Sequence, residues 1–362
     1  MSSTIQSATA LQNTLQRVKD SPEFKQILDQ LQRGARVISI SGLVAGSARA
    51  LAVAALQREV GKPFAVVTQS TRDIEPWERD LRFWYCALSG KQTCNEEVLV
   101  LPASESDPYA GVSPHAQTLE QRALTLWRLR QHSHDLVLLT ARALARKTVS
   151  PSAIADYGTV LKRDSEIPPD VLVEKLMATG YMREDPVSAV GEYSMRGGIV
   201  DIWPPGLSAP VRIEFFGDTI DSLREFDPET QLSTGQLRVV EVPPMHELSV
   251  NSQDFQLWAE AARERWTDDR YARSLRDRTA FANEGEAFAG WEWLIPIIKD
   301  CNSSIFEHLK DAVLVIDEPG GIESYLSDDY DELSRRYNEI DQATTSPCRL
   351  KSCICRLKNC EP

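Results

Sequence analysis

The feature that most constrains the fold is a regular alternation of short apolar runs with longer amphipathic stretches up to about residue 150. The apolar runs have the length of strands, and the stretches between them carry apolar residues at helical spacing. We expect strands at 36–43, 63–70, 96–103 and 135–144, and helices at 47–62, 77–90 and 113–131. This alternation predicts an α/β fold whose parallel sheet is covered on both faces.

The first predicted strand leads into a glycine-containing loop and an alanine-rich helix, "ISISGLVAGSARALAVAAL" (38–56). This is the layout of a phosphate-binding loop, in which a Lys reaches the outer phosphates and the Ser or Thr after it holds Mg²⁺. Here Arg49 stands in the place of the Lys, and Ala50 has no hydroxyl. We therefore expect the loop to persist as core without hydrolysis, cofactor or metal. The degenerate loop comprises Gly42, Gly46, Ser47 and Arg49.

The charge of the chain bears on its partners. The 362 residues carry a formal net charge of −13. Tight DNA binding needs clustered Lys and Arg, and we find no such cluster before the C-terminal end. The charge therefore argues against tight DNA binding and fits a partner with a basic surface. Because we find neither a membrane-spanning apolar run nor a signal-peptide core, we expect a cytoplasmic protein that contacts no membrane.

The cysteines are unevenly placed. Four of the seven lie within "CRLKSCICRLKNC" (348–360), whose spacing lacks the usual pairs of zinc ligands. A metal site and a non-native or disordered tail are both open, and we expect the latter for residues 341–362. The other three, which are scattered, suit reduced thiols. They are Cys86, Cys94 and Cys301.

After residue 150 the pattern changes to that of a smaller α+β domain. A short strand is followed by a helix that opens after Pro168 and closes near Gly180, and residues 187–244 are rich in strands and turns. Helical segments then return before "AVLVIDEPGG" (312–321), which we interpret as a strand that completes the first sheet. The α+β unit would then be an insertion.

The run "VLVIDEP" also resembles the strand that holds Mg²⁺ in ATPases, because Asp317 and Glu318 follow four apolar residues. The alternative is a buried strand that ends in a polar turn, stopped by Pro319. Since Ala50 offers no hydroxyl to share a metal, we favour the structural interpretation.

The most informative segment lies in the α+β domain, from Gly191 to Gln231. Because side chains alternate along a strand, "VRIEFF" (211–216) directs Arg212, Glu214 and Phe216 to the face opposite the core. A large aromatic ring on a charged face is typical of a protein-recognition site. The pattern alone leaves open that the ring covers an edge of its own domain and that the arginines pair with neighbouring carboxylates.

The segment "GEYSMRGGIVDIWPPG…PVRIEFFGDTIDSLREFDPETQ" resembles the signature of two related bacterial DNA-repair families, UvrB and the transcription-repair coupling factors. Upstream, "SGLVAGSARAL" and "SDPYAGVSPHAQTLEQRALTLWRL" resemble the coupling factors in particular, where the nucleotide loop is degenerate. The resemblance covers roughly residues 30 to 340. It implies a split, helicase-like parallel-sheet domain with an inserted α+β domain that binds UvrA.

The resemblance also implies which side chains contact UvrA. In these families the contact is made by an Arg in the "RG" turn and by the Arg and second Phe of the "R-x-x-F-F" strand. These positions are Arg196, Arg212 and Phe216 here. Glu192 and Glu214 lie nearby and are weaker candidates, either as contacts or as groups that orient the arginines.

The sequence pattern and the resemblance together predict five segments: a helical lead (1–34), two halves of the helicase-like domain (35–154 and 245–340), the inserted domain (155–244) and the tail (341–362). Coupling factors continue into regions that bind RNA polymerase and translocate on DNA, which this chain stops before. We expect a non-hydrolysing docking module that recruits UvrA in transcription-coupled nucleotide excision repair. Two alternatives stay open: an ATP-dependent helicase-type fragment with residual nucleotide binding, and the non-functional remnant of a broken gene.

Overall fold

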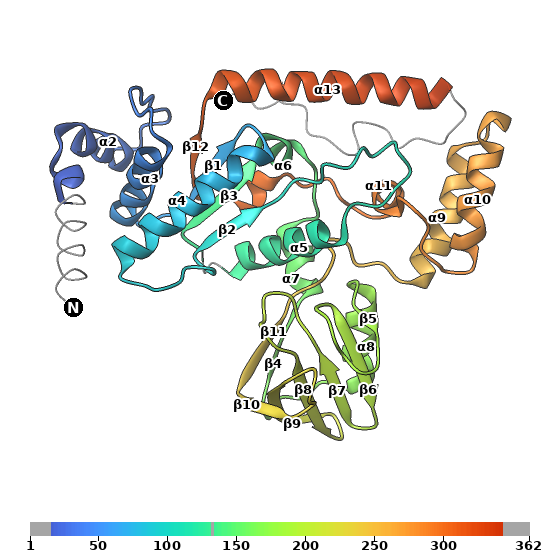
Figure 1. The fold of residues 1–362 in the computed structure, drawn as a ribbon. Coiled ribbons are helices and arrows are strands. Elements are labelled where there is room, and N and C mark those ends of the chain that lie inside the picture. The colour runs from blue at the N-terminus through green and yellow to red at the C-terminus, as the bar shows by residue number, and fades with distance from the viewer. Residues whose placement is uncertain (1–15, 132–133, 343–362) are drawn as a thin grey trace. The chain divides into compact units, whose positions relative to one another are not determined.

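The computed structural model describes residues 16–131 and 134–342, which divide into two compact units. Unit 1 comprises residues up to 101 together with 134–144 and 309–326, and unit 2 comprises 102–131, 145–308 and the residues after 326. Figure 1 shows the elements of both. Among the described residues, no helix is long and apolar enough to cross a membrane.

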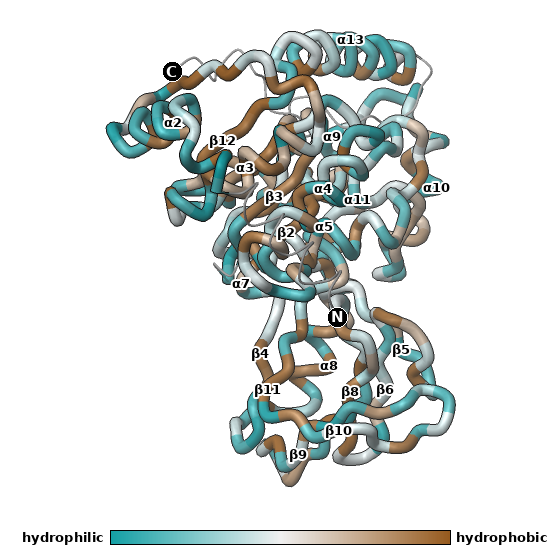
Figure 2. Tube along the Cα trace, turned by 60° about the vertical axis from the view of Figure 1, so that its left-hand side comes forward, coloured by the Kyte–Doolittle hydropathy of each residue, from teal (hydrophilic) through white to brown (hydrophobic). Residues whose placement is uncertain are grey.

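Unit 1 is built on a parallel sheet of four strands in the order β12-β1-β3-β2. The strands are β1 (Phe64–Thr68), β2 (Val98–Leu101), β3 (Leu136–Thr140) and β12 (Val313–Ile316). Every residue of β1, β2 and β3 is buried, which explains their continuous apolar sequences. Figure 2 shows β3 as hydrophobic. The α/β fold class, with a parallel sheet and a separate second sheet, is confirmed.

The sheet is assembled from distant parts of the chain. Val66 of β1 lies beside Val315 of β12 and Leu138 of β3. The chain therefore leaves this sheet after β3 and returns to it with β12, as expected from the sequence. Strand β12 pairs on one side only within the described residues, and Leu314 and Ile316 remain 39% and 40% exposed.

Helices pack on the sheet of unit 1 through a shared apolar core. They are α2 (Pro22–Gln32), α3 (Gly46–Val60) and α4 (Thr71–Ser89). Their buried side chains include Phe24, Val53 and Leu81, which belong to one cluster with the strand residues. Helix α3 ends at Gly61, whose φ of 68° is adopted more readily by glycine than by residues with a side chain.

The strand expected at 36–43 is not formed, and this part of the prediction is wrong. Residues 36–45 carry no strand hydrogen bonding, and Val37 and Val44 are 88% and 89% exposed. A strand is stabilised by pairing with a neighbour and by burial of its side chains. This run has neither, because no strand of the described sheet pairs with it.

The second sheet, in unit 2, has six strands in the order β10-β9-β8-β7-β6-β5. It is antiparallel except for the short β5–β6 pair. Its strands are β5 (Met182–Arg183), β6 (Glu192–Arg196), β7 (Ile199–Ile202), β8 (Val211–Phe216), β9 (Thr219–Phe226) and β10 (Ser233–Leu237). Helix α8 (Pro169–Ala178) contributes Leu172 and Leu176 to the core on one face (Figure 1). Strands β4 (Thr159–Lys162) and β11 (Val239–Val242) form a separate antiparallel pair.

The remaining elements are mostly helical. They are α5 (Ala116–Gln131), α6 (Ala141–Ala145), α7 (Pro151–Tyr157), α9 (Ser252–Arg265), η1 (Asp269–Tyr271), α10 (Ala272–Asn283), α11 (Trp291–Leu294), η2 (Ile295–Ile297), α12 (Ile305–His308) and α13 (Pro319–Gln342). Apart from the last two residues of α13, the proposed tail, with its four cysteines, lies outside the described residues. The five-segment division stays a prediction.

Candidate protein-interaction face

The sheet of unit 2 has one apolar and one polar face, as its pairing register shows. Asp201 of β7 lies opposite Arg212 of β8, and Arg212 lies opposite Arg224 of β9. Cross-strand partners share a face, so these side chains all lie opposite the core. We call this surface the polar face. It comprises Arg196, Ile199, Asp201, Arg212, Glu214, Phe216, Ser222 and Arg224.

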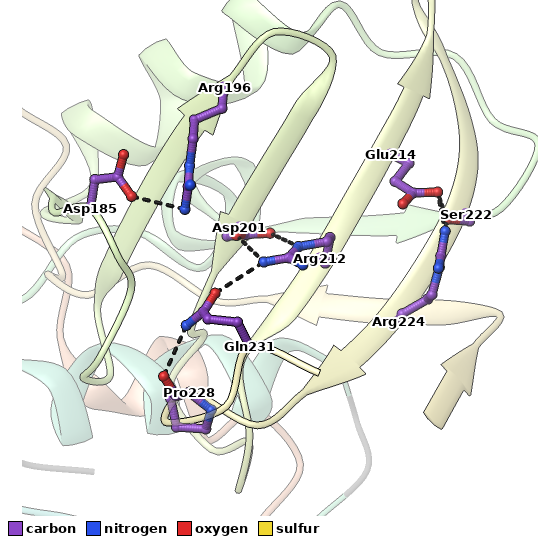
Figure 3. Close-up of polar contacts among 9 residues, drawn as sticks. All are labelled: Asp185, Arg196, Asp201, Arg212, Glu214, Ser222, Arg224, Pro228 and Gln231. Carbon is purple, nitrogen blue, oxygen red and sulfur yellow. Dashed lines mark hydrogen bonds and ion pairs between the residues drawn. The ribbon is translucent and has the colours of Figure 1, made fainter. Parts of the chain in front are cut away.

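Arg212 lies at the centre of the polar face and is held by its own domain (Figure 3). Its Nε and Nη2 donate to the two carboxylate oxygens of Asp201 at 2.7 and 2.8 Å, and Nη2 also donates to Gln231 at 3.1 Å. The guanidinium lies 4.7 Å from the ring centroid of Phe226. The hydrogen bond to Asp201 raises the pKa of Arg212, against the opposing effect of partial burial.

Phe216 is the most exposed part of the face. Phe216 is the residue after Phe215 in β8. Phe215 packs against the core, and because side chains alternate along a strand, the ring of Phe216 lies on the opposite face of the sheet. Phe216 is 84% exposed. A phenyl ring in water is unfavourable by roughly 25 cal/mol per Å² of apolar surface, so its burial by a partner would favour association.

Two glycines shape the end of the sheet where Phe216 lies. Gly197 has a φ of 59°, a conformation that side chains rarely adopt, and a Cβ on Gly198 would lie 3.1 Å from the carbonyl oxygen of Phe215. The Phe215 amide donates to the Gly198 carbonyl at 2.8 Å. The β6–β7 turn therefore adjoins the end of β8, and Ile199, which is 37% exposed, begins β7 beside this turn.

Arg196 occupies the last position of β6 and is accessible. Its Nη2 lies 2.9 Å from an oxygen of Asp185, and both side chains are more than half exposed. An exposed pair of this kind contributes roughly 0–1 kcal/mol to stability. Arg196 can therefore leave Asp185 and pair with a carboxylate of a partner with little loss of folding stability.

The two glutamates named from the sequence bond to neither Arg196 nor Arg212. Glu214 accepts hydrogen bonds from Ser222 and Arg224, and Figure 3 shows this group. The Ser222 hydroxyl is the main cause that lowers the pKa of Glu214, and Arg224 adds to it. Glu192 accepts hydrogen bonds from the amide of Ser188 at 2.7 Å and orders the turn before β6.

Sequence reasoning missed several members of the polar face, namely Ile199, Asp201, Ser222 and Arg224, and it missed Gln231, which bonds to Arg212 from the β9–β10 turn. Side chains alternate along "GIVDI", so the sequence pattern could have assigned Ile199 and Asp201 to the face opposite the core. Their partners could not be assigned, because the loop that joins β7 to β8 leaves the register between them undetermined.

The degenerate loop in unit 1 is exposed at Gly42, Gly46 and Ser47, so the expectation that it persists as core is wrong. Its polar side chains bond to other residues of the same unit. Arg49 Nη1 lies 2.5 Å from one oxygen of Asp317, and Trp77 Nε1 donates to the other at 2.8 Å. Ser47 Oγ accepts a hydrogen bond from Trp84. With no hydroxyl on Ala50, these residues do not fit a nucleotide with Mg²⁺. No group of three or more His, Cys, Asp or Glu side chains suited to a metal occurs in the described part of the chain.

The segment that carries the polar face matches a known protein family. Residues 160–248 match the family described as the UvrB interaction domain. All strands that carry the polar face, from β6 to β9, fall inside this match. Residues 160–248 are therefore similar to UvrB interaction domains.

The chain outside the UvrB interaction domain has relatives as well. It is 31% identical to the transcription-repair-coupling factor of Myxococcus xanthus over 87% of this chain and 26% of the relative. It is 31% identical to that of Bacillus subtilis over 66% of this chain and 19% of the relative, and 29% identical to that of Escherichia coli over 49% and 15%. The chain thus spans about a quarter or less of the length of these relatives. Its resemblance to these coupling factors is confirmed.

Proposed function

We propose that the chain is a docking module that recruits UvrA in transcription-coupled nucleotide excision repair, in the cytoplasm, through its UvrB interaction domain. The observation that carries this proposal is the 84% exposure of Phe216 on the polar face of that domain. A solvated aromatic ring on a face that also carries arginines is the composition of a binding hot spot. The relatives' name supports the link to coupled repair. Contacts with RNA polymerase and DNA, which the resemblance assigns to other regions, are no part of this module.

The proposed contact has two parts. Phe216 fills an apolar notch on UvrA, and Arg196 exchanges its exposed pair with Asp185 for a carboxylate on UvrA. Arg212 presents the part of its guanidinium that Asp201 and Gln231 leave unbonded. Glu192 and Glu214 act on the protein's own backbone and side chains and are peripheral to the contact.

We propose further that the module does not hydrolyse ATP. The support is the ion pair between Arg49 and Asp317, which engages both charged groups that a phosphate and a metal would need. A bound phosphate would have to compete with Asp317 for Arg49, and Mg²⁺ would have to displace both Arg49 and Trp77 from Asp317. The helicase-type alternative depends on these same groups.

UvrA binding is tested by titrating purified UvrA into three separate proteins: the Phe216→Ala variant, the Arg196→Glu variant and the unchanged chain. Loss of a central aromatic or Arg contact typically costs about 2 kcal/mol, so each variant should weaken binding roughly 30-fold. Phe83→Ala is the matched control, because Phe83 is a second exposed phenylalanine, 57% exposed, in unit 1. Wild-type affinity for both polar-face variants would remove this surface from the proposal.

Nucleotide binding is tested separately, by titrating Mg²⁺–ATP and following the fluorescence of the tryptophans, one of which contacts Asp317. We expect no saturable signal at micromolar nucleotide and no phosphate release. Saturable binding that is lost in Asp317→Asn would support the helicase-type alternative instead. The two tests are independent, since the groups involved lie in different units.

A further inference from the structure

The side chain of Arg212 is held in one orientation, unlike that of Arg196 on the same face. Its planar guanidinium meets the carboxylate of Asp201 edge to edge through two hydrogen bonds of 2.7 and 2.8 Å. Such a bidentate pair fixes the plane of the guanidinium as well as its position. Arg196, in contrast, has a single contact with an exposed carboxylate.

Asp201 is well placed to impose this orientation. Its side chain is only 4% exposed, and within the described residues its carboxylate accepts hydrogen bonds from Arg212 alone. A buried carboxylate without a cation is strongly disfavoured, so Asp201 keeps Arg212 in place. The residue lies in the middle of β7, where the backbone is paired on both sides.

A second support comes from the turn between β9 and β10. Gln231 accepts from Arg212 Nη2 at 3.1 Å, while its own amide donates to the carbonyl of Pro228 at 2.9 Å (Figure 3). Asp227 closes the turn by accepting hydrogen bonds from the amides of Glu229 and Thr230. The turn is thus ordered independently of Arg212 and offers Gln231 as a fixed acceptor.

These supports engage Nε and Nη2 but leave Nη1 without a hydrogen bond within the described residues, on a side chain that is 21% exposed. The guanidinium therefore reaches the surface already oriented, with one donor group available. A side chain that is ordered before binding loses less conformational entropy when a partner engages it.

We propose that Asp201 and Gln231 are positioning residues that orient Arg212 for docking on an acidic group of the partner. This inference rests on the proposed function, because it concerns the same contact with UvrA. Substitution of Asp201 or Gln231 leaves the guanidinium of Arg212 on the polar face but allows it to change orientation. The expected weakening corresponds to ordering one long side chain, roughly two- to tenfold in the dissociation constant.

The test measures UvrA affinity by calorimetry for Asp201→Asn and Gln231→Ala, each in the unchanged chain and in a chain that carries Arg212→Gln. If Asp201 and Gln231 act through Arg212, each substitution should weaken binding roughly two- to tenfold in the otherwise unchanged chain. In the Arg212→Gln chain, the same substitution should weaken binding by less than twofold. Asp221→Asn, an exposed acid on β9, is the matched control and should leave affinity unchanged.

The outcomes separate this inference from the proposed function. Equal weakening in both backgrounds would show a merely structural role, and no weakening in either would exclude positioning. If Arg212→Gln itself leaves affinity unchanged, positioning is excluded as well, whereas the docking surface is judged by Phe216→Ala and Arg196→Glu. Should Asp201→Asn fail to fold, Gln231→Ala decides alone, since its side chain lies in a surface turn.

Discussion

Arg49 and Asp317 form an ion pair at 2.5 Å although 268 residues separate them in the chain. The pair joins the first turn of α3 to the end of β12, and Trp77 of α4 donates to the same carboxylate at 2.8 Å. Three segments of unit 1 therefore meet at one acid. In a phosphate-binding loop the equivalent positions serve the nucleotide, whereas here they hold the protein together.

We predict that Arg49→Met destabilises the protein by about 1–3 kcal/mol, because it leaves the largely buried Asp317 carboxylate, 15% exposed, without its cation. Urea unfolding measures the change. Arg33→Met is the control, since Arg33 pairs with Asp29 at the surface and should cost less than about 1 kcal/mol. Equal losses for the two variants would mean that the internal pair is dispensable.

The two adjacent phenylalanines of β8 should respond in opposite ways to truncation. Phe215→Ala removes apolar packing from the core of unit 2 and should lower the free energy of unfolding by about 2 kcal/mol or more. Phe216→Ala should change it by less than about 0.5 kcal/mol, because the ring is 84% exposed. Thermal unfolding of both variants provides the comparison. A large loss for Phe216→Ala would show that the ring supports its own domain.

The stability of unit 2 should fall as the pH falls below about 6.5, the usual histidine pKa. Burial lowers the pKa of both His246 and His308 in the folded protein. The unfolded chain then binds more protons between the folded and unfolded values, so the free energy of unfolding rises with pH across that window. NMR titration should place both pKa values below 6.5.

The contribution of His308 can be isolated. Its ring nitrogen Nε2 lies 2.9 Å from the carbonyl oxygen of Val149, and a glutamine amide can donate to the same oxygen. His308→Gln should therefore reduce the dependence of stability on pH between about pH 6.5 and 5. Burial would raise the pKa of the nearby acid, Glu247, but Arg122, Thr148 and His308 together lower that pKa below its ordinary value. An unchanged slope in His308→Gln would contradict the assignment.

Two glycine substitutions should separate a packed site from an open one. A Cβ at Gly158 would lie 2.1 Å from Nε1 of Trp127, so we expect Gly158→Ala to cost about 1–3 kcal/mol through overpacking. At Gly46, the first residue of α3, no atom lies within 4 Å of the added Cβ, and Gly46→Ala should be neutral or slightly stabilising. Circular dichroism during urea unfolding measures both. Tolerance at Gly158 would mean that Trp127 moves freely.

Much of the sheet of unit 1 was predictable because its strands are buried on both faces. Continuous apolar runs such as 98–101 and 136–140 result from that burial, and the amphipathic stretches between them form the expected helices. The run at 36–43 also contains β-branched apolar residues, together with Arg, Ser and Gly, but it has no partner strand within the described residues. The sequence pattern of a segment indicates its propensity to form a strand. Whether the strand forms depends also on a neighbouring strand from another part of the chain with which it can pair.

The polar face was predictable in part for a similar reason. Alternation in "VRIEFF" placed Phe216 on the face opposite the core, and the exposure of its ring agrees. That Arg212 is engaged by Asp201 could not be read from the sequence, because it depends on the register between β7 and β8. The sequence left open that neighbouring acids pair with the arginines, and Asp185 and Asp201 do so.

One side of β12 has no pairing strand within the described residues, and this bears on how the protein behaves at high concentration. A strand bonded on one side, with Leu314 and Ile316 partly in water, can accept a foreign strand without breaking any existing bond. Asp311 and the exposed Glu318 flank this four-residue strand with negative charge, which repels a second copy of the same edge. High salt, which screens this repulsion, should therefore favour fibril-like aggregation of the purified protein.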